Sequence, residues 1–478
     1  MTFNNGAAQI NSSVISGSGS VAKNGGATLM WGAQGAYTGL TAINGGTLIN
    51  ASGVNGLGAA WGPASIIGNA TWTLNGISAS AGSLALTNGN CGVSRNGNLN
   101  FTNVVSNGVS SIGVSELKIG ADQIGGIYTA LFNVTDGTLT LNVNKLWNYA
   151  SGTMNATSSV VKTGAGTAVI ANLGSSYKGS TTLSGGVWQV SILANGGTDS
   201  HIGQSGSAAT NLVLNGGTLK YTGAAVTIDR RFSLGTNGGT LDASGSGALT
   251  LNNAGAVGFA NSGARTLTLT GTSAGANTLA ASLGDNGGPT ALLKSGTGAW
   301  TLSGANSFSG GTVVSGGTLT VAASATLGTG NLTVSNGASC VIQNAAALAN
   351  GTYVYLNGAL NLANSGTNTV ARLYIGGVLQ AAGLWNTARD AVHFAGAGGL
   401  NVTGGRATEP IVLTGSALSG GGIKLTWTNS AADLYCTPTL VPPVVWVTVT
   451  NPPVWFNDQW SVAVPGGTNA SGFYRLEQ

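Results

Sequence analysis

The sequence predicts an all-β chain in which the first four-fifths coil into stacked turns of strands, followed by a small antiparallel β domain. Three observations support this fold class. A cassette of residues recurs along the chain, apolar residues alternate with polar ones, and the composition changes near residue 406. Recurrence at a fixed spacing is the signature of repeat architectures, and period-2 alternation is typical of strands with one buried face.

The cassette is clearest at residues 294–321, and looser copies occupy residues 162–190 and 23–49. In every copy an aromatic residue stands two positions before a glycine, and a Gly-Gly pair begins eight positions after the aromatic. The aromatic residues are Tyr37, Tyr177 and Phe308, and the pairs begin at Gly45, Gly185 and Gly316. Shared spacing in three copies is hard to produce by composition alone, so it indicates a repeat architecture.

This cassette resembles the passenger-associated transport repeat, also called the autotransporter-associated β-strand repeat, of secreted surface proteins of Gram-negative bacteria. The copy at residues 294–321 matches closely, and residues 229–235 and 238–245 look similar to the same family. The resemblance implies a right-handed parallel β-helix outside the cell. It implies no particular chemistry, because such repeats serve as stalks for many functions.

Residues 1–405 are therefore expected to form the solenoid. The motif Asn-Gly-Gly-Thr-Leu begins at Asn215 and again at Asn237, 22 residues on, which suits one coil of three sides. Glycine pairs would form the corners, where a positive φ costs glycine little. Leucine and valine of the following strand would point inward. We expect the aromatic of each cassette to cover glycine backbone of the adjacent coil, with a sugar-binding platform as the alternative.

The end of the solenoid is expected near residues 370–403, where the Gly-Gly-Thr-Leu pattern stops and a closing cap would shield the last coil. Residues 406–410 read as a linker. Residues 411–478 hold six of the nine prolines and predict a small antiparallel β-sandwich-like domain with strands at 423–427, 444–449, 459–464 and 472–476. Its four tryptophans would form a core or contact a ligand: Trp427, Trp446, Trp455 and Trp460.

Composition narrows the classes of function. The chain is 42% hydrophobic, which argues against a disordered polymer, and its net charge of +4 is scattered, which argues against nucleic-acid binding. Cys91, Cys340 and Cys436 are far apart, show no metal-ligand spacing and are expected to be small buried fillers, although one pair could bridge. No cofactor motif is present, and no apolar run is long enough to span a membrane.

Candidate catalytic groups are weak. None of the twelve carboxylates forms an Asp-Asp or Asp-x-Asp pair, and Asp229, Arg230, Arg231 and Asp242 are explained as a salt-linked face of the solenoid. Residues 271–275 fit the pattern around a nucleophilic serine at Ser273, but that pattern needs a strand, a turn and a helix, and only His201 and His393 could act as bases.

The function expected from these observations is a non-enzymatic extracellular structural or adhesive protein, in which a rigid stalk displays a C-terminal module on a Gram-negative cell surface. The alternatives are a polysaccharide-degrading β-helix enzyme and a glycan-binding surface protein. Expected partners are cell-surface or extracellular polysaccharide, and self-association through the solenoid ends is a variant. No signal peptide is visible, so an extracellular protein would begin inside a longer gene product or have lost its signal.

Overall fold

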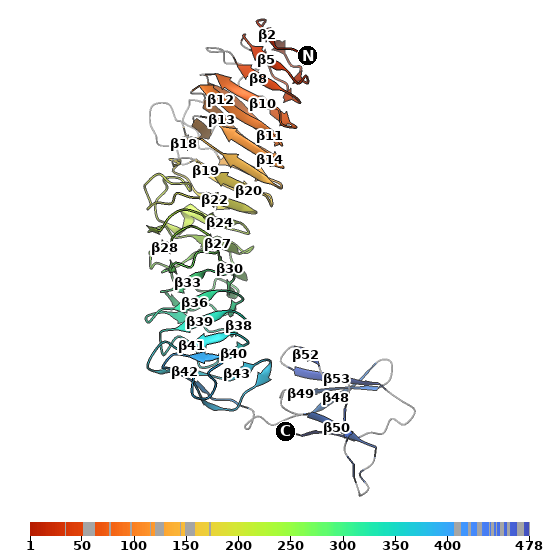
Figure 1. Ribbon diagram of the computed structural model, residues 1–478, viewed down its shortest axis with the longest axis vertical. Helices are drawn as coiled ribbons and strands as arrows, with labels where there is room; N and C mark the ends of the chain where they lie inside the picture. The colour runs from red at the N-terminus through yellow and green to blue at the C-terminus, as the bar shows by residue number, and fades with distance from the viewer. Residues whose placement is uncertain are drawn as a thin grey trace.

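The computed structural model describes residues 1–33, 35–50, 63–75, 78–95, 98–114, 116–119, 129–143, 145–148, 158–171, 174–405, 413–418, 422–427, 433–438, 440, 444–445, 447–449, 454–456, 459–465 and 473–477. Residues 1–405 wind into a long rod of stacked coils, with the N-terminal strands at one end and the closing strands at the other (Figure 1). Strands of successive coils pair in parallel, so the rod is a parallel β-solenoid, as the sequence predicts.

Three main sheets run along the rod. The first is 14-stranded and contains β1 (Thr2–Phe3), β4 (Val21–Lys23), β7 (Thr41–Ile43), β9 (Ala64–Ile67), β11 (Ser78–Thr87), β13 (Asn98–Asn107), β15 (Glu116–Ile119), β16 (Thr129–Val134), β18 (Lys145–Asn148), β19 (Ser159–Thr163), β21 (Thr181–Leu183), β23 (Leu212–Leu214), β26 (Ser233–Leu234) and β29 (Gly258–Phe259).

The second sheet extends along the whole rod, from β2 to β43. Its parallel strands are β2 (Gln9–Asn11), β5 (Thr28–Trp31), β8 (Thr47–Asn50), β10 (Thr71–Asn75), β12 (Asn90–Arg95), β14 (Val109–Gly113), β17 (Thr138–Leu141), β20 (Thr167–Ile170), β22 (Val187–Val190), β24 (Thr218–Tyr221), β27 (Gly239–Ala243), β30 (Arg265–Thr270), β32 (Thr290–Lys294), β35 (Thr312–Val314), β38 (Leu332–Val334), β40 (Tyr353–Leu356) and β43 (Arg372–Ile375).

The third sheet is 8-stranded and lies in the second half of the rod. It contains β25 (Val226–Ile228), β28 (Leu249–Leu251), β31 (Asn277–Leu279), β33 (Ala299–Leu302), β36 (Thr318–Val321), β39 (Ser339–Ile342), β41 (Ala359–Asn361) and β46 (Phe394–Ala395). Short pairs close further corners: β3 (Ser16–Gly17) with β6 (Ala36–Tyr37), and β34 (Ala305–Asn306) with β37 (Thr326–Leu327). One 3-10 turn, η1, spans Ala209–Asn211.

The alternation in the sequence becomes the wall of the solenoid. In β17, β24 and β36 the leucine, tyrosine and valine positions are buried, and the threonines between them face outward. The inward side chains join one apolar core along the rod. Rings also stack from coil to coil, since the centroids of Phe101 and Phe132 lie 5.2 Å apart and those of Phe132 and Trp188 lie 5.6 Å apart. Each coil therefore buries its apolar face against its neighbours.

The expected coil length holds only locally. Leu219 pairs with Leu241, which is the 22-residue step that the two Asn-Gly-Gly-Thr-Leu motifs predict. Trp188 pairs with Leu219, a step of 31 residues, because a long segment that includes η1 separates β22 from β23. Strands fix the wall, whereas corners accept insertions at little cost, so coil length varies along the rod.

Glycine pairs form corners, as expected. The second glycine of each cassette pair has a positive φ: +63° at Gly46, +58° at Gly186 and +60° at Gly317. A Cβ atom at Gly186 or Gly317 would lie 2.3 Å from a carbonyl oxygen of the preceding coil. Both the backbone conformation and the close approach of the coils therefore require glycine.

Strand direction changes near the end of the rod. β42 (Thr367–Val370) still pairs in parallel with β47 (Gly399–Val402), but β44 (Val378–Leu379) pairs antiparallel with β43, and β45 (Gly383–Trp385) pairs antiparallel with β47. This segment, 367–402, is called the cap below. The linker expected at residues 406–410 lies outside the described residues.

The C-terminal residues form two antiparallel sheets with a separate small core. One sheet orders β48 (Thr414–Ala417), β49 (Gly422–Trp427), β53 (Gln459–Pro465) and β52 (Val454–Phe456), and the other orders β51 (Val447–Thr448), β50 (Asp433–Thr437) and β54 (Phe473–Glu477). Four of these strands overlap the predicted ones. Strands β48, β50 and β52 were not predicted, because they are short and lack clear alternation.

The cysteines are free. Cys91 and Cys340 are buried in the core, and burial raises the pKa of both thiols to about 12. Cys436 is half-buried, so the expectation of a fully buried filler is wrong for this residue. It lies on β50, a short strand whose sheet has only three members.

Candidate functional site

Each cassette contains a lysine whose whole side chain is buried. Lys23, Lys162 and Lys294 are 1%, 0% and 0% exposed, and each occupies an inward position near the end of its strand. Lysine is almost never fully buried without a partner. These three ammonium groups must therefore find hydrogen-bond acceptors inside the solenoid.

Backbone carbonyl oxygens of two coils supply those acceptors. The Nζ atom of Lys294 donates to the carbonyls of Ser295 at 2.8 Å and Gly296 at 3.1 Å in its own coil, and to that of Gly316 at 2.8 Å in the next. Lys162 repeats this arrangement with Thr163, Gly164 and Gly185, at 2.7, 2.9 and 3.2 Å.

Lys23 follows the same rule in the first cassette. Its Nζ donates to the Gly25 carbonyl and, at 2.9 Å, to the carbonyl of Gly45. In all three cassettes the acceptor in the next coil is thus the first residue of the Gly-Gly pair. The lysine links the end of one inward strand to the following corner, and we call this contact the lysine bridge.

Burial lowers the pKa of these lysines. The pKa falls to about 8 at Lys162 and Lys294 and is also lowered at Lys23, because an apolar surrounding disfavours the charged form. Three carbonyl acceptors match the three N–H donors of an ammonium group, and a neutral amine would leave one carbonyl unpaired.

The cassette aromatics pack as expected against glycine of the next coil. A Cβ atom at Gly203 would lie 2.6 Å from the ring of Tyr177, and one at Gly328 would lie 3.1 Å from the ring of Phe308. All three aromatic side chains are buried, Tyr37 and Phe308 included. Rings without exposed faces cannot stack on a sugar, so the packing role holds and the platform alternative is wrong for these residues.

Tyrosine adds a hydrogen bond that phenylalanine lacks. The hydroxyl groups of Tyr37 and Thr41 lie 2.6 Å apart, and those of Tyr177 and Thr181 lie 2.7 Å apart. In the third cassette Phe308 takes the tyrosine position, and the buried Oγ1 of Thr312 has no hydrogen-bond partner. The cassette that matches the repeat pattern best therefore leaves one buried hydroxyl unsatisfied.

Arg230 does not form the salt-linked face expected from the sequence. Its guanidinium is buried and donates to the carbonyls of Ala194, Asn195, Thr198 and Gly203 and to the hydroxyl of Ser205. The arginine thus holds the long segment between β22 and β23 onto the rod. Sequence reasoning missed this role because adjacent charges of opposite sign suggest ion pairs, whereas carbonyl acceptors carry no sequence signal.

The described carboxylates accept hydrogen bonds instead of converging on a groove. Asp136 accepts from the Gly108 amide at 2.7 Å, Asp229 from the Gly196 amide at 2.7 Å, and Asp285 from the Thr290 amide at 2.7 Å. Ser273 is also engaged, since its hydroxyl donates to the Gly247 carbonyl and accepts from the Gly275 amide. Across the described ranges no three His, Cys, Asp or Glu side chains gather as metal ligands.

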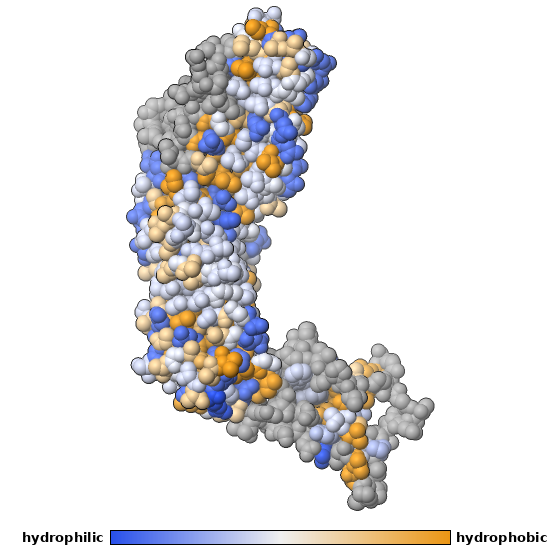
Figure 2. Space-filling model, viewed as in Figure 1, coloured by the Kyte–Doolittle hydropathy of each residue, from blue (hydrophilic) through white to orange (hydrophobic). Residues whose placement is uncertain are grey.

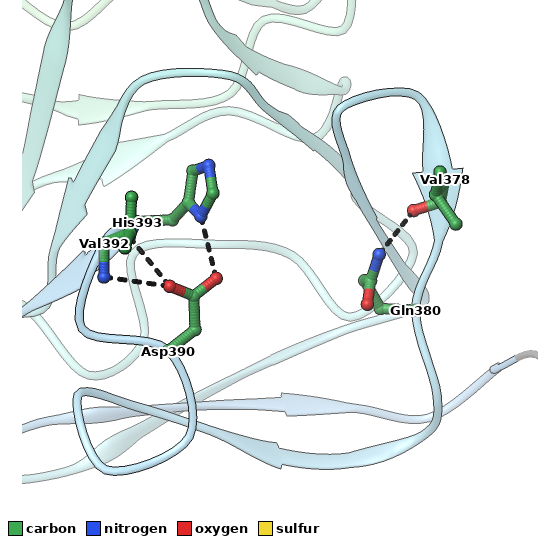
Figure 3. Close-up of polar contacts among 5 residues, drawn as sticks. All are labelled: Val378, Gln380, Asp390, Val392 and His393. Atoms are coloured by element: carbon green, nitrogen blue, oxygen red, sulfur yellow. Dashed lines mark hydrogen bonds and ion pairs between the residues drawn. The ribbon is translucent and has the colours of Figure 1, made fainter.

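The two histidines lie in different surroundings. His201 is fully buried, and its Nδ1 accepts a hydrogen bond from the Ser191 amide at 3.2 Å. His393 lies in the cap, where its Nδ1 is 2.8 Å from Oδ2 of Asp390 (Figure 3). The Oδ1 atom of Asp390 also accepts from the amides of Val392 and His393, which holds the pKa of this carboxyl below its usual value. The pair shapes the loop before β46.

The predicted tryptophans of the C-terminal sheets fall mostly in one row. Trp427 on β49 pairs with Trp460 on β53, which pairs in turn with Trp455 on β52. Opposite residues of antiparallel strands share a face, and this face includes the buried Leu425 and Val462. Trp427 is 2% exposed and belongs to the core, and Trp460 is partly exposed. Trp446 lies outside the described residues.

Comparisons with known proteins agree with the repeat pattern. A family model described as passenger-associated-transport-repeat matches residues 21–49, 160–190 and 292–321, which contain the three lysine bridges. The chain is 40% identical over 174 residues, or 35% of its length, to a protein named adhesin BmaC autotransporter of Brucella suis biovar 1 (strain 1330). It spans about 5% of the length of that relative. No solved structure matches the chain.

Proposed function

The chain carries three repeats of the passenger-associated-transport-repeat family on a parallel β-solenoid, and we propose that it is a rigid, non-enzymatic segment of an adhesive passenger on the surface of a Gram-negative bacterium. The observation that carries this proposal is the 40% identity over 174 residues to a protein named as an adhesin autotransporter. Within the described residues no helix is apolar and long enough to cross a membrane.

The rod suits a displaying role for physical reasons. Its wall consists of backbone hydrogen bonds between coils, and its outer positions are threonine, serine and asparagine instead of charged residues. Only 6% of the residues are charged, so long-range electrostatic attraction contributes little to binding. An adhesive contact of this protein would depend on shape and hydrogen bonding at short range.

The C-terminal sheets are proposed as a separate module that the rod displays, beginning near residue 411. Its apolar residues form their own cluster, distinct from the core of the solenoid. Of the tryptophans considered as ligand contacts, Trp460 is the one whose described side chain is partly exposed, so it is the best candidate for contact with a glycan.

Binding of the purified chain to immobilised host cells and to extracellular polysaccharide tests the adhesive role. We expect saturable binding by residues 1–478 and no change in the polysaccharide, measured by reducing-end release. Absence of binding would contradict adhesion, and release of reducing ends would favour the alternative of a polysaccharide-degrading enzyme. Comparing residues 1–405 with the full chain locates the contact: binding that disappears with the C-terminal sheets places it in the module.

A further inference from the structure

A groove of about 430 Å³ crosses the outer surface of the rod at four successive coils. Its lining includes Asn237 at a corner before β27, Arg265 and Thr266 at the start of β30, Pro289 before β32 and Gly310 before β35. Since coils are spaced about 4.8 Å apart, a groove across four of them extends about 14 Å along the rod.

Backbone contacts hold these coils in register around the groove. A Cβ atom at Gly238 would lie 2.4 Å from the Thr266 carbonyl, so the corner at Asn237 rests on β30. The Arg265 amide donates to the Pro289 carbonyl at 3.1 Å, and the Gly310 amide donates to the Thr290 carbonyl at 2.8 Å. The groove is therefore a fixed feature of the wall.

Arg265 brings a positive charge to this groove. Its side chain is 5% exposed, and it donates to carbonyls of Leu234, Asn261, Gly263 and Asn286. No carboxylate within the described residues forms an ion pair with it. A buried cation without a counter-ion is costly, and this one lies where an anion from solvent can approach.

One hydrogen-bond donor of this arginine is spare. The Nη1 atom carries two hydrogens, and its printed acceptor is the Leu234 carbonyl at 2.8 Å. Lys162 and Lys294 differ in this respect, because each of them has a carbonyl acceptor for all three N–H groups. The guanidinium of Arg265 can thus add a charge-assisted hydrogen bond without giving up those that hold the corner.

The rim offers neutral polar groups and an apolar ring. Thr236, Asn237 and Thr266 are exposed, and the amide of Asn237 and the hydroxyl of Thr266 make no side-chain hydrogen bond to described residues. Pro289 is also exposed. The middle of the rod is pale in Figure 2, as a surface of intermediate hydropathy should be. Hydroxyl and amide groups beside an apolar ring suit the alternating hydroxyl and C–H surfaces of a sugar.

We infer that this groove binds a linear acidic saccharide, with a sugar carboxylate directed at Arg265 and sugar hydroxyls bonded to Asn237 and Thr266. The length of the groove fits a few residues of such a chain. The inference does not require the adhesive role, since groove binding by purified protein and attachment to cells are separate measurements.

Isothermal titration of the full chain with trigalacturonate, a hyaluronan tetrasaccharide and neutral maltotriose tests this inference. We expect at least one of the acidic probes to bind about tenfold more tightly than maltotriose and to bind more weakly as salt is raised. Thr266→Val should weaken that binding about fivefold. The matched control is Thr227→Val, an exposed outward threonine on β25 that does not line the groove, and it should leave binding unchanged.

Three results would overturn the inference. They are no binding of either acidic probe at millimolar concentration, equal affinity for acidic and neutral probes, and equal weakening by Thr266→Val and Thr227→Val. Arg265→Lys keeps the charge but removes the planar fork of donors, so it should weaken acidic probes and leave the weaker binding of maltotriose unchanged. Unchanged circular dichroism of each variant confirms that the coil still folds.

Discussion

Phe308 and Thr312 stand in the third cassette where the first two cassettes have a tyrosine and a threonine joined by a hydrogen bond. Tyr37 and Thr41, and likewise Tyr177 and Thr181, bring their hydroxyl groups within 2.6 and 2.7 Å. Thr312 keeps its buried hydroxyl but has no acceptor or donor opposite it. The three copies of one sequence motif thus contain a natural comparison of the same contact with and without its hydrogen bond.

Restoring this bond should stabilise the third cassette. Phe308→Tyr gives Thr312 a partner, and we expect the free energy of unfolding to rise by about 1 kcal/mol. The reverse change, Tyr177→Phe, should lower it by a similar amount. Denaturant titration of both variants and of Phe308→Tyr/Thr312→Val measures the effect. If Phe308→Tyr destabilises the chain as much as Tyr177→Phe does, the inferred correspondence between cassettes is wrong.

Removing a lysine bridge should cost more than removing a surface lysine. Lys294→Met keeps the length of the buried side chain but leaves three carbonyl oxygens without a donor, and we expect a loss of about 2–4 kcal/mol. Lys178→Met is the matched control, because Lys178 is exposed, and its effect should stay within about 0.5 kcal/mol. Comparable unfolding midpoints for the two variants would show that the bridge contributes little.

The lysine bridges also predict how stability depends on pH. Burial lowers the pKa of Lys162 to about 8 from 10.5, so between these values the unfolded chain binds more protons than the folded one. The free energy of unfolding contributed by this residue therefore rises with pH through that window and is constant below it. Lys162→Met lacks the titration. Denaturant titrations at pH 7 and pH 10 should show the original chain gaining stability relative to this variant, and a relative loss would contradict the assigned direction.

Much of the fold could be predicted because its determinants are local. The positive φ of Gly186 and Gly317 and the inward leucines of the cassettes follow from residue type and alternation. The burial of Lys294 could not be predicted from composition, because lysine is normally exposed. A usable signal was nevertheless present: each cassette lysine precedes its Gly-Gly pair by 22 or 23 residues, the spacing that one coil requires.

Features that depend on distant segments were missed. Arg230 binds carbonyl oxygens of the segment between β22 and β23, and such acceptors are invisible in a sequence because every residue has one. The groove at Arg265 depends on the stacking of four coils of unequal length. Period and spacing define a wall, but where insertions open that wall is set by three-dimensional packing.

Glycine at the cassette corners should be irreplaceable. Gly317 has a φ of +60°, and a Cβ atom there would lie 2.3 Å from the Gly298 carbonyl oxygen. Gly317→Ala is expected to destabilise the chain by about 2–4 kcal/mol through backbone strain and separation of the coils. Gly351→Ala is the control, since nothing lies within 4 Å of the added methyl group. Thermal unfolding of both variants measures the difference, and similar midpoints would argue against tight corner packing.

The distance between Thr138 and Thr268 tests most directly whether the chain is one continuous stack. The two residues are joined by strand pairs through Thr167, Val187, Thr218 and Thr240, which makes five steps. Spin labels on Thr138→Cys and Thr268→Cys, with Cys436→Ser and the buried Cys91 and Cys340 unlabelled, should give a narrow distribution centred near 24 Å, because each step is about 4.8 Å. A broad distribution, or a mean far above this value, would contradict the parallel solenoid on which every other conclusion depends.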